Sequence, residues 1–153
     1  MQPIIQTKNV LAILDQAPTT KGHVRITPIE ETIIFEQATD EVAAELFSVA
    51  NELSSTLFEI LQAKGSNLLI QNGQCAGQDE NQLSLQVIPR FEEDGLNMVW
   101  QSEPASEEDL LESQKIIQEA LLAKPKDPKE IEVEQEEQKN KDKWIKDALF
   151  RLP

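Results

Sequence analysis

The feature that most constrains the fold is a long stretch of helical periodicity in the first half of the chain. Apolar residues recur there at helical spacing: Val42, Leu46, Val49, Leu53, Leu57, Ile60 and Leu61. Thr39 precedes two acidic residues, as an N-cap does, and Lys64 and Gly65 supply a cation and a glycine at the other end. The pattern predicts one amphipathic helix over about 40–63 with one buried face.

Segments with the character of strands stand on both sides of this helix. They are expected at 4–6, 10–14, 23–29, 67–71 and 82–90. Ser106 is expected to cap a second helix, with Asp109 in the capping-box position three residues on. The arrangement predicts the α+β class, an antiparallel sheet of about five strands with one long helix and a C-terminal helix.

The composition changes after the second helix. "AKPKDPKE" sets two prolines among charges, and "EIEVEQEEQKNKDK" is almost entirely charged or amide. We therefore expect one domain over 1–123, a charged linker over 124–143 and a short amphipathic segment over 144–153.

That last segment, "KWIKDALFRLP", gathers apolar side chains. Those expected to bind a partner are Trp144, Ile145, Leu149, Phe150 and Leu152. An apolar cluster beyond a hydrophilic linker is expected to become buried. Two alternatives stay open: it docks as a helix in the groove of a partner protein, or it folds back onto its own chain or dimer.

Charge and composition exclude several classes of function. The formal net charge is -14, with 28 acidic against 14 basic side chains, which argues against binding nucleic acid or an anionic membrane. No apolar run approaches the roughly 20 residues of a membrane span, and no signal peptide opens the chain, so a cytoplasmic protein is expected. Cys75 is the single cysteine, which rules out an internal disulfide or a cysteine-based metal site. No cofactor or metal is predicted.

Two stretches resemble a known family. "VLAILDQAPTTKGHVRITP" resembles the opening hairpin of histidine-triad (HIT) nucleotide-binding proteins, and "GSNLLIQNGQCAGQDENQLSLQVIPRFEEDGL" looks like the signature region of that family. The two stand in the right order around one long helix, and the resemblance runs from about Ile4 to Leu122. It implies a HIT-like fold, nucleotidyl hydrolase or transferase chemistry, a purine nucleotide as ligand and a homodimer.

The histidine triad itself is missing. The His-x-His-x-His motif of the family falls on Gln82, Ser84 and Gln86. In the family the middle histidine attacks the α-phosphorus, which needs a group that is basic near neutral pH. The serine hydroxyl is inert without a neighbouring base, and glutamine takes no proton at pH 7. We therefore predict a pseudoenzyme without catalytic residues.

Other positions of the family site are retained. The resemblance makes Asp15 the acceptor of the ribose hydroxyls, sets His23 beside the site, and gives Gly77 and Gln78 to the phosphate loop; Ser84 is a further candidate for nucleotide contact. The plainer interpretation of Asp15 is a turn residue that ends a strand, and that of His23 is a hydrogen-bonded structural residue.

Three hypotheses for the function follow. The first is a catalytically inactive HIT-like domain that serves as a protein-interaction or nucleotide-sensing module. The second is an active enzyme with altered chemistry, in which His23 helps Ser84 or a metal binds Asp79 and Glu80. The third is a purely structural subunit of a larger complex. Asp79 and Glu80 would also repel a phosphate at the neighbouring loop, unless a metal intervenes.

Overall fold

The computed structural model describes residues 2–123 of the 153-residue chain. The chain divides into two compact units, Met1–Met98 and Val99–Pro153, which are described separately. The expected linker and the partner-binding residues Trp144, Ile145, Leu149, Phe150 and Leu152 lie outside the described residues, so the domain boundaries drawn from the sequence stay predictions.

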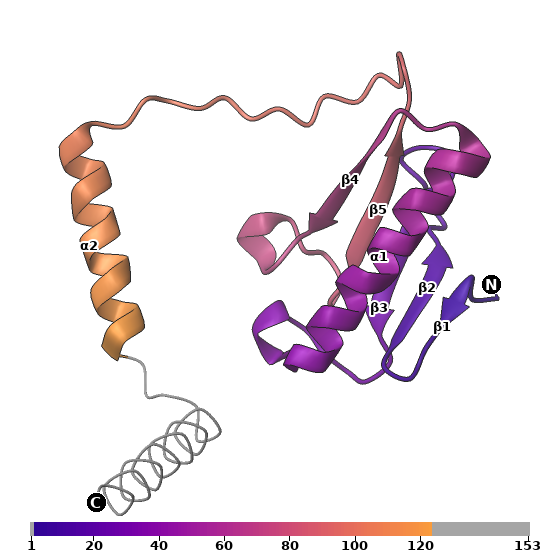
Figure 1. Cartoon of the computed structure of the whole chain (residues 1–153), viewed down its shortest axis with the longest axis horizontal. Helices are drawn as coiled ribbons and strands as arrows, with labels where there is room; N and C mark the ends of the chain where they lie inside the picture. Colours follow the sequence, from indigo (N-terminus) through magenta and orange to yellow (C-terminus); the bar gives the residue numbers. More distant parts are fainter. Residues whose placement is uncertain (1, 124–153) are drawn as a thin grey trace, which may run out of the picture. The chain divides into compact units, whose positions relative to one another are not determined.

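The first unit is built on one antiparallel sheet (Figure 1). Its strands are β1 Ile5–Gln6, β2 Val10–Leu14, β3 Val24–Pro28, β4 Gly65–Ile70 and β5 Leu85–Arg90. Their order across the sheet is β1-β2-β3-β5-β4, so the last strand enters between two earlier ones and leaves β4 at an edge. The predicted α+β class, with five antiparallel strands and a long helix, is confirmed.

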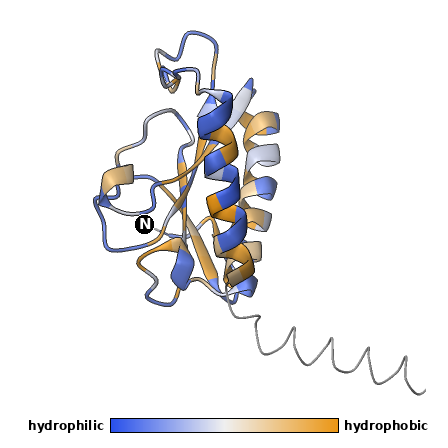
Figure 2. Ribbon diagram, turned by 90° about the vertical axis from the view of Figure 1, so that its left-hand side faces the viewer, coloured by the Kyte–Doolittle hydropathy of each residue, from blue (hydrophilic) through white to orange (hydrophobic). Residues whose placement is uncertain are grey.

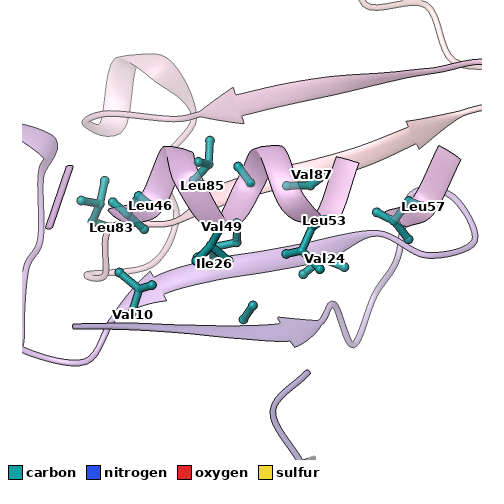
Figure 3. Packing of buried hydrophobic residues seen from close by; sticks show 12 residues of the cluster. Val10, Val24, Ile26, Leu46, Val49, Leu53, Leu57, Leu83, Leu85 and Val87 are labelled. Carbon is teal, nitrogen blue, oxygen red and sulfur yellow. The ribbon is translucent and has the colours of Figure 1, made fainter. Parts of the chain in front are cut away.

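The helix α1, Asp40–Leu61, lies across one face of this sheet and builds the core with it (Figures 1 and 3). The buried side chains of the two layers interdigitate: Leu46, Val49, Leu53 and Leu57 from α1, Val10 from β2, Val24 and Ile26 from β3, and Leu85 and Val87 from β5. Aliphatic burial of this kind contributes roughly 25 cal/mol per Å² of apolar surface removed from water. The layer fixes β3 and β5 side by side, which positions the site on the opposite face.

The N-terminal end of α1 agrees with the prediction from the sequence, and the C-terminal end differs from it. The Thr39 hydroxyl accepts a hydrogen bond from the Val42 N–H at 3.3 Å, as an N-cap does. At the C-terminus the helix ends at Leu61, and Gln62, with φ 56°, takes the left-handed conformation that glycine most often supplies at helix ends. Gly65 instead begins β4, because the helix ends and the next strand begins two residues earlier than expected.

In the second unit, the helix α2 runs over Glu107–Ala123. The Ser106 hydroxyl accepts from the Asp109 N–H at 3.1 Å and donates to the Asp109 carboxylate at 2.5 Å, so the predicted cap is present. Hydrophobic and hydrophilic residues interleave along the helix (Figure 2), and none of its residues is buried. Across the described residues, no helix combines the length and apolar character needed to cross a membrane.

Candidate functional site

The three residues at the positions of the family motif, Gln82, Ser84 and Gln86, are here named the polar row. The row was predicted to lie on one strand, but it begins before that strand does. β5 starts only at Leu85, so Gln82 and Ser84 belong to the preceding loop, which corrects the strand expected over 82–90. The Leu83 N–H donates to the Thr32 carbonyl at 2.7 Å, which ties this loop to the segment after β3 instead of to a strand. Burial still alternates through both parts: Leu83 is buried, and its neighbours Gln82 and Ser84 are half-exposed.

The two glutamines of the row make hydrogen bonds within the protein. Gln82 Nε2 donates to the Pro28 carbonyl at the end of β3 (3.2 Å), and Gln86 Nε2 donates to Gln71 Oε1 just after β4 (3.2 Å). Each amide therefore links the row to a neighbouring strand. Ser84 lies between them and lines the same small pocket.

An arginine that the sequence analysis did not assign occupies the centre of the site. Arg25 is the register partner of Gln86, directly across from it on β3. Its Nε and Nη2 both donate to Asp15 Oδ2, at 3.0 and 2.8 Å, and its Nη1 donates to Glu80 at 2.6 Å. The guanidinium thus bridges the two carboxylates, of which Glu80 lines the same small pocket as Ser84. The signal that could have found it is the alternation of β3, which sets Arg25 on the same face as His23.

Asp15, the predicted ribose acceptor, is engaged on both oxygens. Its Oδ1 accepts from the Ala17 N–H at 2.8 Å, and its Oδ2 accepts both bonds from Arg25; only 5% of its side chain is exposed. Burial alone would raise the pKa of Asp15, but the Ala17 N–H and the Arg25 guanidinium outweigh it and hold the pKa below its usual value. The carboxylate is therefore ionised, and it is turned toward groups of its own chain.

The predicted phosphate loop is held in place by hydrogen bonds of one of its own side chains, that of Gln78. Gln78 Oε1 accepts from the Gly73 N–H at 2.7 Å, and Gln78 Nε2 donates to the carbonyls of Ile33 and Glu80 at 2.8 and 2.9 Å. Gly77 has φ +86°, and a Cβ at this position would lie 2.6 Å from Gln71 Nε2. The loop needs glycine here for its own geometry.

His23 lies buried at the start of β3, with 3% of its surface exposed. The Thr19 N–H donates to its Nδ1 at 3.2 Å, so the neutral ring carries its proton on Nε2. That Nε2 is buried and has no hydrogen-bond partner among the described residues. Burial lowers the pKa of His23, against opposing effects of the Asp15 carboxylate and the Gln86 side chain, although Gln86 does not reach Nε2 with hydrogen-bond geometry.

Little space remains where these groups meet. The pocket is lined by Arg25, Gln71, Gln78, Asp79, Glu80, Gln82, Ser84 and Gln86, and the room between them is about 10 Å³. A volume of that size holds roughly one water molecule. Among the described residues, no cluster of three or more His, Cys, Asp or Glu side chains is placed to hold a metal ion, and this includes Asp79 and Glu80.

Comparison with known proteins identifies the family. A model of the HIT domain matches residues 1–93. The chain belongs to the HIT family. It is 31% identical over 108 residues to an adenosine 5′-monophosphoramidase of Schizosaccharomyces pombe, covering 70% of this chain and 78% of that one. It is 30% identical over 100 residues to the protein hit of Bacillus subtilis, covering 65% and 69%.

Solved structures of the family share the fold. The crystal structure of a HIT family protein from Bacillus anthracis superposes with a TM-score of 0.71 at 30% identity, covering 77% of this chain and 86% of that one. The family and the fold expected from the sequence are both confirmed.

Proposed function

We propose that this protein is a catalytically silent HIT domain that acts through protein contacts. One observation carries the proposal. The Arg25 guanidinium, which is paired with both Asp15 and Glu80, lines the pocket at the positions of the family motif, and that pocket has room for about one water.

The chemistry of the row supports this proposal. A nucleophile at Ser84 needs a base within hydrogen-bond reach, roughly 2.6–3.2 Å. The imidazole of His23 accepts its hydrogen bond at Nδ1, from the Thr19 N–H, and its Nε2 makes no hydrogen bond to Ser84 or to any other described residue. The amides of Gln82 and Gln86 donate to fixed acceptors, and they can neither take a proton nor carry positive charge.

The same geometry disfavours nucleotide sensing. A ribose would need the Asp15 carboxylate, which already accepts three hydrogen bonds, from Ala17 and Arg25. A phosphate would need a positive, open loop, whereas Glu80 is already paired with Arg25, and Gln78 fixes the loop from within. Binding of AMP would have to break the ion pair between a buried carboxylate and an arginine that is 25% exposed, which costs about 1–3 kcal/mol.

The surface that supports protein contact is the outer side of α1 together with the edge strand β4, here named the α1–β4 face. Phe47 and Phe58, eleven residues apart on α1, are 44% and 59% exposed, and Leu68 on β4 is 46% exposed. A contact of 3.4 Å between the hydroxyls of Ser54 and Ser66 joins the two elements between them. An unpaired strand edge beside exposed aromatic rings favours pairing with another chain, and we propose a homodimer through this face.

Turnover assays test catalytic silence. Purified protein is incubated with an adenosine phosphoramidate and with adenosine dinucleotides, with and without a divalent metal, beside Ser84→Ala. We expect no release of AMP above the rate of Ser84→Ala in any condition. Turnover that Ser84→Ala abolishes would establish the rival hypothesis of an enzyme with altered chemistry.

Calorimetric titration with AMP tests nucleotide sensing. We expect no binding by the wild-type protein, and weak binding once Arg25→Leu frees the Asp15 carboxylate. Adding Asp15→Asn to Arg25→Leu should remove that binding again. Binding by the wild-type protein that Asp15→Asn weakens would favour a nucleotide sensor.

A further inference from the structure

The helix α2 presents an apolar stripe on which no described residue of its own unit is packed. Leu110, Ile117 and Leu121 recur at i, i+7 and i+11 and therefore lie on one face. They are 59%, 59% and 60% exposed. At 1.5 Å per residue the stripe is about 16 Å long. Three large aliphatic side chains aligned in water indicate a surface that a second amphipathic element covers.

The charge of α2 restricts what that element can be. The helix carries five acidic residues and a single basic one, Lys115. Glu108, Glu112 and Glu119 project from the face opposite the stripe, since they follow the i, i+4, i+11 spacing about half a turn away. A second copy of α2 would bring the same negative charge, whereas a basic amphipathic segment would be attracted.

One segment of this chain has that character. In "KWIKDALFRL" the apolar residues fall on one face of a helix: Trp144, Ile145, Ala148, Leu149 and Leu152. Lys143, Lys146 and Arg151 stand against the single acid Asp147, so the segment is basic in an otherwise acidic chain. As a helix, 144–152 would be about 13 Å long, close to the length of the stripe.

The length of chain between the two elements favours contact within one molecule. Twenty residues, 124–143, separate the end of α2 from Trp144. A coil of that length has a root-mean-square span of about 25 Å, which is close to the full length of α2, so the segment reaches any part of the stripe. Such a tether gives an effective concentration in the millimolar range, far above that of a second copy at ordinary protein concentrations.

We propose that residues 144–152 pack as an amphipathic helix against the Leu110–Ile117–Leu121 stripe of α2 in the same molecule. The apolar faces of the two helices exclude water from each other, and the net positive charge of the segment is attracted by the net negative charge of α2. The segment then completes the second unit of the chain, and its apolar residues are withheld from other proteins as long as it stays docked.

The fluorescence of Trp144 tests this contact in the full chain. The protein has two tryptophans, and Trp100 is 79% exposed, so Trp100→Phe leaves Trp144 as the sole reporter with little disturbance. In that background we expect emission shifted to short wavelength, as for a buried indole. Ile117→Glu, which keeps a good helix former at the position, should shift the emission to that of exposed tryptophan. Glu112→Gln, on the opposite face, should leave it unchanged.

Three other outcomes of the fluorescence measurement would contradict docking of the segment on α2 in the same molecule. Emission of exposed tryptophan in the Trp100→Phe parent would overturn the proposal. A buried Trp144 that ignores Ile117→Glu would show that the segment packs elsewhere, which also overturns it. A blue shift that grows with protein concentration would assign the stripe to a second copy and refute docking within one molecule. Circular dichroism of each variant checks that helical content is retained.

Discussion

Arg25 holds the pocket closed through two unequal arms. The arm to Asp15 consists of two hydrogen bonds, of 3.0 and 2.8 Å, to a side chain that is only 5% exposed. The arm to Glu80 is a single bond of 2.6 Å to a side chain that is 58% exposed. A buried carboxylate that loses its ion pair is costly, whereas an exposed pair contributes little because water screens it. The ion pair with Asp15 therefore contributes most of the stabilisation, and the ion pair with Glu80 contributes little.

Removing Arg25 and removing the charge of Glu80 should have very different effects. Arg25→Leu leaves the Asp15 carboxylate buried without its ion pair, and we expect the free energy of unfolding to fall by about 1–3 kcal/mol. Glu80→Gln should change it by less than about 0.5 kcal/mol. Urea unfolding at pH 7 measures both. Asp15→Asn combined with Arg25→Leu should recover part of the loss; equal losses from Arg25→Leu and Glu80→Gln would contradict this account.

His23, the single histidine of the chain, should make stability depend on pH near neutrality. Burial lowers the pKa of His23 in the folded state. Below about pH 6.5 the unfolded chain therefore binds a proton at this histidine that the folded chain does not bind. Stability is full above that pH and falls as the pH decreases, by about 1.4 kcal/mol per unit of pKa difference at most. The lowered pKa of Asp15 acts in a separate window, with stability lost only below about pH 3.9.

Thermal unfolding between pH 7.5 and 5.5 measures the effect of His23. The wild-type melting temperature should fall over this range, and His23→Asn should flatten the curve, since asparagine offers an oxygen in place of Nδ1 and does not titrate. An equal slope in His23→Asn would assign the titration to other groups.

At the level of elements, the sequence predicted the helix, whose apolar residues recur periodically, and missed features that depend on how the strands pair. The helix over 40–63 follows from seven apolar residues at helical spacing, and the structure has it at Asp40–Leu61. Arg25 was missed because its role depends on β5 entering next to β3, which places it opposite Gln86; no local pattern encodes that register. The start of β5 was missed because alternating burial continues through a loop that pairs with Thr32 instead of with a strand.

The turn before β3 is packed directly against the end of α1, and this should make substitution of Gly22 costly. It has φ +88°, and an added Cβ would collide with Leu61 Cδ1 and lie 3.2 Å from Leu57 Cδ2. Gly95 has a similar φ of +74° but nothing within 4 Å of such a Cβ. Gly95→Ala should therefore cost only the backbone strain, about 1–2 kcal/mol, and Gly22→Ala about 1–3 kcal/mol more from overpacking. Urea unfolding compares them, and equal losses would show that the helix yields to the extra methyl group.

For the whole molecule, the sheet has one face covered by α1, one face that carries the closed pocket, and a six-residue edge at β4. With the pocket closed by Arg25, the α1–β4 face is the part of this unit that combines unpaired backbone with exposed aromatic rings. Exposed edges of this kind are usually blunted by charge, and the strand "GSNLLI" carries none. The net negative charge of the chain does not protect this edge, since no charged residue lies in the strand.

A lysine in β4 should therefore separate the proposed dimer into monomers. Light scattering after gel filtration should give about twice 17.3 kDa for the wild-type chain and 17.3 kDa for Leu68→Lys, because two like charges would face each other where the edges pair. Leu14→Lys is the matched control: Leu14 is 43% exposed, but it lies in the interior strand β2, which pairs with β3 along its length and with β1 at Leu11 and Ala12. It should leave the mass doubled. A wild-type mass of 17.3 kDa would show that the chain is a monomer and would refute the proposed dimer. Dissociation by both lysine substitutions alike would show that β4 is not the pairing surface.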